Sequence, residues 1–142
     1  MAKTIATAMG ALFLLVGIIG LLGIADNILG FHLSVAHDLI HLVTGAVFLY
    51  IGLRGTLSAA RMLCIAFGAV YLLLGLAGFL FGTDQASTMP GMTMGNTRLL
   101  RIIPGALELG TVDHVYHIIT GLVFLIGGLM TKAVMDRTGE RA

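Results

Sequence analysis

Long apolar runs, separated by short polar segments, dominate the hydropathy pattern of this chain. Residues 5–25 and 62–82 form two such runs without a single charged side chain. Two more runs, at residues 35–53 and 112–131, begin with histidine and aspartate and are otherwise apolar. A helix of roughly 20 apolar residues is long enough to cross the ~30 Å hydrocarbon core of a bilayer. The pattern therefore predicts an all-α fold, a bundle of four transmembrane helices.

The four runs form an internal repeat of two helical hairpins, at about residues 5–54 and 61–132. M-G-A-L-F-L-L-V-G-I-I-G-L-L at residues 9–22 aligns with F-G-A-V-Y-L-L-L-G-L-A-G-F-L at residues 67–80. A two-helix repeat returns the chain to its starting side of the membrane. The two hairpins are therefore expected to be parallel, related by a pseudo-two-fold axis along the membrane normal, within one membrane domain that covers residues 1–142.

Composition and charge agree with a bilayer environment. The chain is 58% hydrophobic and only 11% charged, and a soluble domain would expose far more charge. Most basic residues flank one end of the predicted helices, and the positive-inside rule then predicts cytoplasmic termini in the cell inner (plasma) membrane. No basic patch suggests nucleic acid, whereas a homo-oligomer or a partner membrane protein is compatible with the sequence. The basic residues at the predicted cytoplasmic end are Lys3, Arg54, Arg61, Lys132, Arg137 and Arg141.

The candidate chemistry lies in a duplicated cluster at the starts of the second and fourth runs. S-V-A-H-D-L-I-H-L-V-T-G, residues 34–45, aligns with T-V-D-H-V-Y-H-I-I-T-G, residues 111–121. His41 is equivalent to His117, but the preceding pair is reversed, so that Asp38 aligns with His114 and Asp113 aligns with His37. Residues three or four apart share one helix face. The two helices are therefore expected to direct four imidazoles and two carboxylates toward a shared centre.

Imidazole and carboxylate are ligands for zinc, copper and iron, and the ligand types alone do not choose among these metals. The sequence thus predicts a transition-metal site near the outer membrane face; haem bound by one histidine from each half is less favoured. The alternative is an accessory or structural protein in which the same residues only bridge helices by hydrogen bonds. Ionisable groups within membrane spans are costly and usually functional, which favours the metal. The candidate ligands are His37, Asp38, His41, Asp113, His114 and His117.

The long segment between the third and fourth runs holds a second, weaker candidate site. Met89, Met92 and Met94 are soft thioethers that could capture Cu(I), although loop methionines often only cover apolar surface. Residues 96–103 are expected to form a short interfacial helix, and Glu108 is expected to be exposed. No catalytic constellation such as a Gly-x-Ser-x-Gly elbow is found, so the sequence favours a binding or structural role over an enzyme.

The motif H-D-L-I-H-L-V-T-G at residues 37–45 resembles the H-N-x-x-H-L-x-x-G signature of a bacterial family of four-helix membrane proteins. That family is known as domain of unknown function 4383. The glycine-rich segment G-A-L-F-L-L-V-G-I-I-G at residues 10–20 is similar to the first helix of the family. The resemblance spans most of the chain and implies a multi-pass inner-membrane protein, with no established activity. Asp38 stands where the family signature has asparagine.

Overall fold

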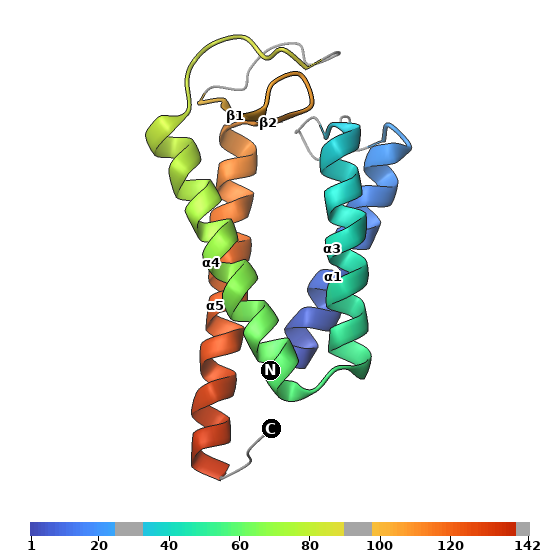
Figure 1. Ribbon diagram of the computed structural model, residues 1–142, viewed down its shortest axis with the longest axis vertical. Helices are drawn as coiled ribbons and strands as arrows, with labels where there is room; N and C mark the ends of the chain where they lie inside the picture. The colour runs from blue at the N-terminus through green and yellow to red at the C-terminus, as the bar shows by residue number, and fades with distance from the viewer. Residues whose placement is uncertain (25–32, 90–97, 139–142) are drawn as a thin grey trace.

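Four long helices make up most of the structure, a computed structural model that describes residues 1–24, 33–89 and 98–138. They are α1 (Ala2–Leu21), α3 (Val35–Arg54), α4 (Leu57–Phe81) and α5 (Thr111–Thr138) (Figure 1). Each contains a stretch that is long and apolar enough to cross a membrane. The predicted all-α bundle of four helices is confirmed, and the chain is a multi-pass membrane protein.

The first helix ends four residues before the predicted limit of its span, for a local reason. Gly23 adopts a φ of +68°, a left-handed conformation that glycine adopts without a steric penalty. The N–H groups of Gly23 and Ile24 then donate to the carbonyls of Gly20 and Ile19. This pair of reversed bonds is a Schellman motif, which satisfies the last carbonyls of a helix and ends it.

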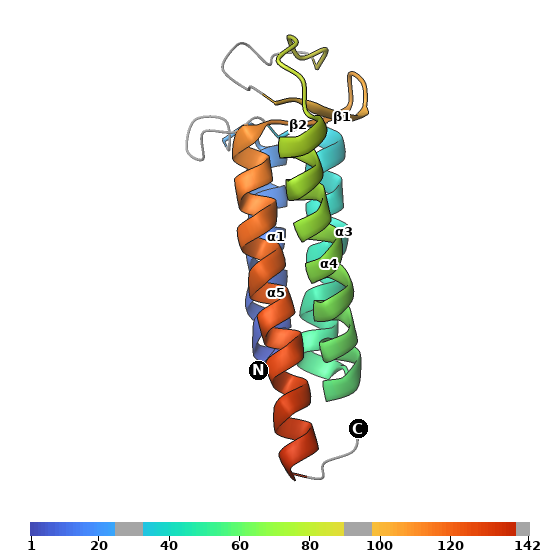
Figure 2. The same cartoon turned by 90° about the vertical axis from the view of Figure 1, so that its left-hand side faces the viewer.

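The helices pair as two tight hairpins, α1 with α3 and α4 with α5, that stand side by side in Figure 1. In Figure 2 the α4–α5 hairpin lies in front of the α1–α3 hairpin. Glycines permit this close approach: a Cβ on Gly10 would lie 2.4 Å from the backbone nitrogen of Leu49, and one on Gly45 would lie 2.7 Å from that of Leu14. Close backbone contact over small residues is a main source of helix association in lipid. The repeat-equivalent pairs in the second hairpin are Gly68 against Leu125 and Gly121 against Leu72.

Aromatic residues pack between the two hairpins. Phe48 stacks on Phe124, with ring centroids 4.6 Å apart, and Phe13 stacks on Tyr71 at 5.7 Å. In each pair the two residues are equivalent by the repeat. Equivalent residues that touch each other must lie close to the pseudo-two-fold axis, so this axis runs through both ring pairs.

The hairpins are joined most closely at the end where α1 begins. There the backbone nitrogen of Ala2 donates to Thr131 Oγ1 at 2.8 Å, and Cys64 Sγ donates to the Ala2 carbonyl at 3.7 Å. The two hairpins diverge toward the opposite end of the bundle, where α3 and α5 begin (Figure 1). The starts of α3 and α5 therefore face each other across a wider separation.

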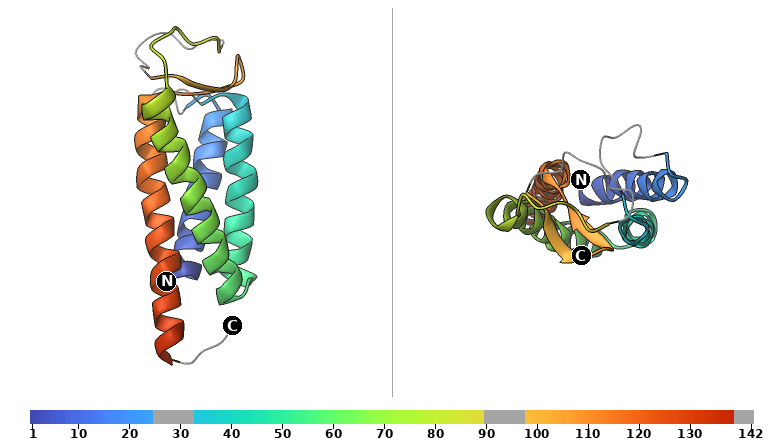
Figure 3. Two further views of the ribbon diagram at one scale, coloured as in Figure 1. Left: turned by 60° about the vertical axis from the view of Figure 1, so that its left-hand side comes forward. Right: turned by 90° about the horizontal axis from the view of Figure 1, so that it is seen from above.

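A short β-hairpin lies across that wider end, close to α4 and α5 (Figure 3). Strand β1 (Leu100–Ile103) pairs antiparallel with β2 (Leu107–Leu109). The predicted interfacial helix over residues 96–103 is therefore wrong for the described residues 98–103. Gly105, with a φ of +77°, forms the turn, and β-branched Ile102 and Ile103 favour strand over helix.

Candidate functional site

A pocket of about 170 Å³ lies between the two hairpins, and all four helices contribute to its walls. We call it the central pocket. The polar residues in its lining include His37 and His41 from α3 and Asp113 and His117 from α5. Aromatic and aliphatic side chains surround these four groups. The full lining is Leu12, Phe13, Val16, Leu33, His37, His41, Tyr71, Asp113, Tyr116, His117 and Thr120.

Five rings around the pocket form a closed circle of contacts. His37 stacks on His41 with ring centroids 4.7 Å apart, and it lies 6.2 Å from His117. His117 in turn stacks on Tyr71 at 4.9 Å. Phe13 closes the circle, because its ring lies 5.7 Å from Tyr71 and 5.2 Å from His41. The three imidazoles are thus held among aromatic neighbours from all four helices.

Local hydrogen bonds orient the polar groups. Ser34 Oγ accepts from the backbone nitrogen of His37 at 3.3 Å and caps α3, as serine commonly does at a helix start. Asp113 Oδ2 accepts from the Gly110 backbone nitrogen at 2.7 Å. His117 Nδ1 lies 2.6 Å from the Asp113 carbonyl oxygen, which can only accept, so Nδ1 carries the proton. In the neutral ring, Nε2 is then left with a lone pair.

The other two candidate residues lie outside the central pocket. Asp38 is buried against α1, where a Cβ added to Gly20 would collide with its carboxylate. His114 is buried against α4, where a Cβ added to Gly78 would collide with its ring. Gly20 and Gly78 are equivalent by the repeat, so Asp38 and His114 occupy equivalent places. His114 Nε2 also lies 2.7 Å from the carbonyl oxygen of Arg98, which ties α5 to the chain two residues before β1.

This division follows from the reversed order of the two residue pairs. Neighbouring residues on a helix point about 100° apart, so only one member of each pair faces the central pocket. The pocket-facing member is His37 in the first hairpin and Asp113 in the second. The pocket therefore receives three imidazoles and one carboxylate, while one aspartate and one histidine pack within their own hairpins.

The side chains do not converge on a common point as they stand. His37 and His41 face each other ring to ring, with planes 18° apart. Among the residues that the structure describes, no three His, Cys, Asp or Glu side chains form a group that could hold a metal ion. His41 Nδ1 is buried without a hydrogen-bond partner in the described part of the chain.

The methionine segment is only partly described. Met89 is buried, with 5% of its surface exposed, and its backbone nitrogen donates to Ser87 Oγ at 3.1 Å. Met89 is thus a buried apolar residue of the segment that joins α4 to β1. Met92 and Met94 lie outside the described residues. The described residues therefore leave the predicted Cu(I) site untested.

Glu108 is the main polar residue that the sequence interpretation misplaced. It was expected to be exposed, but only 2% of its surface is accessible. Its carboxylate accepts from Ser87 Oγ at 2.7 Å, the Thr88 backbone nitrogen at 3.0 Å and the Gly105 backbone nitrogen at 3.1 Å, as well as from the Thr88 hydroxyl. Arg101 Nε lies 3.6 Å from the same carboxylate. Glu108 thus links the segment after α4 to the turn of the β-hairpin.

These contacts determine the acidity of Glu108. Burial alone would raise the pKa of the carboxyl, but hydrogen bonds from Thr88, Ser87 and the Gly105 backbone outweigh it and lower the pKa to about 2. A carboxylate with several donors favours its charged form. No sequence motif marks this cluster, because its members come from three separate stretches of the chain.

Comparison with known protein families finds a match over most of the chain. A family model, described as domain of unknown function (DUF4383), matches residues 3–130. The chain belongs to the DUF4383 family. The match covers both hairpins and the segment between them, and it confirms the resemblance found in the sequence. No curated protein and no solved structure matches the chain.

Proposed function

We propose that the central pocket binds one transition-metal ion through His37, His41, His117 and Asp113. The observation that carries this proposal is the common lining of one pocket by three imidazoles and one carboxylate drawn from both hairpins. Imidazole and carboxylate are ligands for zinc, copper and iron. Asp38 and His114 are not included in the proposed ligand set, because each is buried against a glycine of its own hairpin.

The spacing of the rings supports the proposal, and their orientation defines what must change on binding. Two imidazoles on one tetrahedral zinc ion, with Zn–N bonds of about 2.0–2.1 Å, place their ring centroids roughly 5 Å apart. The observed separations of His37 from His41 and from His117 are 4.7 and 6.2 Å. Side-chain rotation, with little movement of the helices, would then direct the nitrogens toward one ion.

The pocket also has space and second-layer support for an ion. Its volume of about 170 Å³ exceeds the ~30 Å³ that one water molecule occupies in the liquid, so an ion and a water molecule both fit. The hydrogen bond from His117 Nδ1 to the Asp113 carbonyl is the kind of contact that orients a metal-binding histidine and leaves its other nitrogen for the metal.

The second candidate is a structural role in which the histidines only bridge helices. The ring contacts of His117 with Tyr71 and with His37 favour it, because they hold α3, α4 and α5 together without an ion. On this account, replacing His41 and His117 weakens the bundle and changes no bound metal.

Elemental analysis of the purified protein separates the two functions. We expect about one transition-metal ion per chain, lost in a His41→Ala/His117→Ala variant that keeps its helical circular dichroism. His114→Ala is the matched control, because it removes a buried imidazole outside the central pocket and should retain the metal. A folded wild type that carries no metal above background, and acquires none from zinc, copper or iron salts, would refute the metal proposal.

A further inference from the structure

The outer surface of the first hairpin carries a groove near the end where α3 finishes. Residues Leu14, Ala46, Leu49, Tyr50, Leu53 and Arg54 line an open hollow of about 730 Å³, within the ~300–1,000 Å³ range of small-molecule clefts. We call it the Arg54 groove. Four of its residues are aliphatic, and Arg54 and Tyr50 supply its polar groups. The groove thus has the composition of an amphipathic binding surface.

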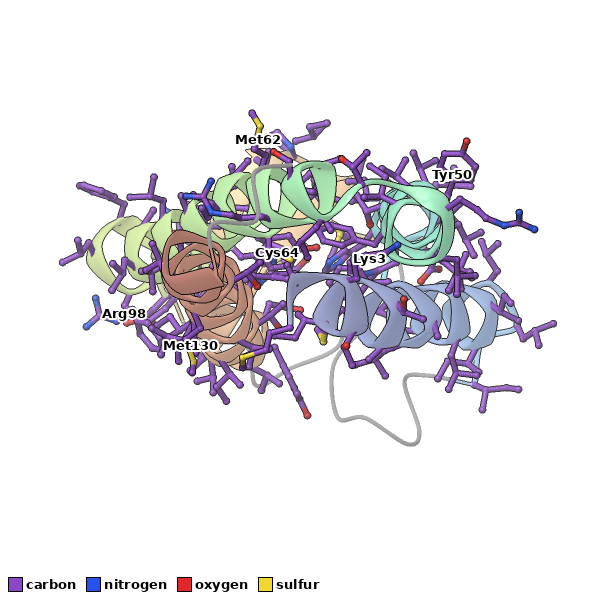
Figure 4. All side chains as sticks on the ribbon, turned by 90° about the horizontal axis from the view of Figure 1, so that it is seen from below. Lys3, Tyr50, Met62, Cys64, Arg98 and Met130 are labelled. Atoms are coloured by element: carbon purple, nitrogen blue, oxygen red, sulfur yellow. The ribbon has the colours of Figure 1, made fainter. Side chains whose placement is uncertain are left out.

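The Arg54 groove faces lipid and not the second hairpin. Tyr50 is 68% exposed and Leu53 is 58% exposed, whereas Phe48, on the inner side of α3, is fully buried against Phe124. Viewed from the end where α1 begins, Tyr50 projects away from α4 and α5 (Figure 4). A molecule in this groove would therefore come from the bilayer.

The internal repeat shows that the groove is a feature of one hairpin only. At the equivalent positions of α5, Leu122 replaces Ala46, Ile126 replaces Tyr50 and Met130 replaces Arg54. The aliphatic residues Leu14, Leu49 and Leu53 have leucine at all three equivalent positions. Arg54 is one of the basic residues that predict the orientation of the helices, but orientation alone does not require a small residue and a hydroxyl on the same surface. The small residue, the hydroxyl and the cation of the first hairpin therefore call for a separate explanation.

We propose that the Arg54 groove binds an anionic phospholipid of the leaflet at this end of the bundle. An acyl chain would lie along the leucines in the space that Ala46 leaves, and the phosphate would contact the Arg54 guanidinium and the Tyr50 hydroxyl. Guanidinium is well suited to phosphate because its N–H groups can donate two parallel bonds. Basic residues near the membrane surface attract anionic headgroups, whereas a zwitterionic headgroup offers no net charge to Arg54.

Native mass spectrometry of the protein released from bilayers of equal phosphatidylglycerol and phosphatidylcholine tests this site. We expect each chain to retain one phosphatidylglycerol in preference to phosphatidylcholine. Retention should fall about fivefold in Arg54→Met, because this is the factor in affinity that one cation near the membrane surface contributes. Ala46→Leu should displace the lipid while leaving all charges in place. Arg137→Met, which removes a cation from the end of α5, is the control and should retain it. Equal retention of the two lipids, or equal loss in Arg54→Met and Arg137→Met, would overturn the proposal.

A gain-of-function variant keeps the test independent of any loss of folding. Leu122→Ala/Ile126→Tyr/Met130→Arg builds the same three residues into the second hairpin. It should raise the number of retained phosphatidylglycerol molecules from one to two per chain. A count that stays at one would contradict the assignment of binding to these three side chains.

Discussion

Replacing Gly78 with alanine tests where His114 lies. A Cβ at Gly78 would stand 2.2 Å from both Cε1 and Nδ1 of the His114 ring, whereas carbon atoms in contact are normally about 3.5–4.0 Å apart. The ring must then move by roughly 1.5 Å, which would break its 2.7 Å contact with the Arg98 carbonyl. Overpacking costs about 1–3 kcal/mol and the lost hydrogen bond about 0.5–1.5 kcal/mol. We therefore expect Gly78→Ala to lower the free energy of unfolding by roughly 1.5–4.5 kcal/mol.

The decisive comparison repeats this substitution in a His114→Ala background. With the ring removed, the new methyl group has space, and alanine is about 0.5–1 kcal/mol more favourable than glycine within a helix. The effect of Gly78→Ala should therefore change sign in the double variant. Titration with sodium dodecyl sulfate in mixed micelles, followed by circular dichroism, measures all four proteins of the cycle. An equal loss of stability in both backgrounds would show that His114 does not occupy the space beside Gly78.

Two further predictions concern the end of the bundle where α3 and α5 begin. Because the pKa of Glu108 is lowered to about 2, its contacts stabilise the fold above the ordinary carboxyl pKa near 4.5, and this stabilisation should be lost as the pH falls from about 4.5 to 2. Thermal unfolding at several pH values should show that acid dependence in the wild type and a weaker one in Glu108→Gln; identical dependence in both would contradict it. Ser34→Ala removes the cap of α3 and should cost about 1 kcal/mol in the free energy of unfolding, whereas an unchanged value would show that the cap is not used.

The helices were predictable because their length and hydropathy leave few alternatives. When an uncharged run such as residues 62–82 lies in lipid, its backbone N–H and C=O groups must form hydrogen bonds within its own helix. The repeat also predicted which glycines are equivalent. The boundaries were less predictable: α4 begins at Leu57, within the polar turn, and α5 continues to Thr138. The thickness of the bilayer predicts how long a helix must be, but it does not predict where a helix ends when the helix continues beyond the membrane.

The segment between α4 and α5 was the least predictable part. A short interfacial helix is expected over residues 96–103, but tertiary contacts determine the strand. The side chain of Arg101 bonds to Gln85 and to the Ala86 carbonyl, and β1 pairs with β2. Contacts between residues this far apart in sequence leave no local signal, which is also why the burial of Glu108 was missed.

The candidate site was predictable as a residue set, but its division into two groups was not. The sequence placed six ionisable residues in the first turns of α3 and α5. Which of two adjacent residues faces the other hairpin depends on the rotation of each helix about its axis. Packing sets that rotation, through Gly20 against Asp38 and Gly78 against His114. The reversed order of His37 and Asp38 relative to Asp113 and His114 then produces the three-imidazole, one-carboxylate pocket.

X-ray absorption at the metal edge of the zinc-loaded protein tests the proposed ligand set most directly. We predict three imidazole nitrogens and one carboxylate oxygen in the first coordination shell at about 2.0–2.2 Å. The His37→Ala spectrum should lose one imidazole, and the spectrum of His114→Ala should match that of the wild type. A shell with fewer than two imidazoles, or one that loses an imidazole in His114→Ala, would contradict a metal site in the central pocket.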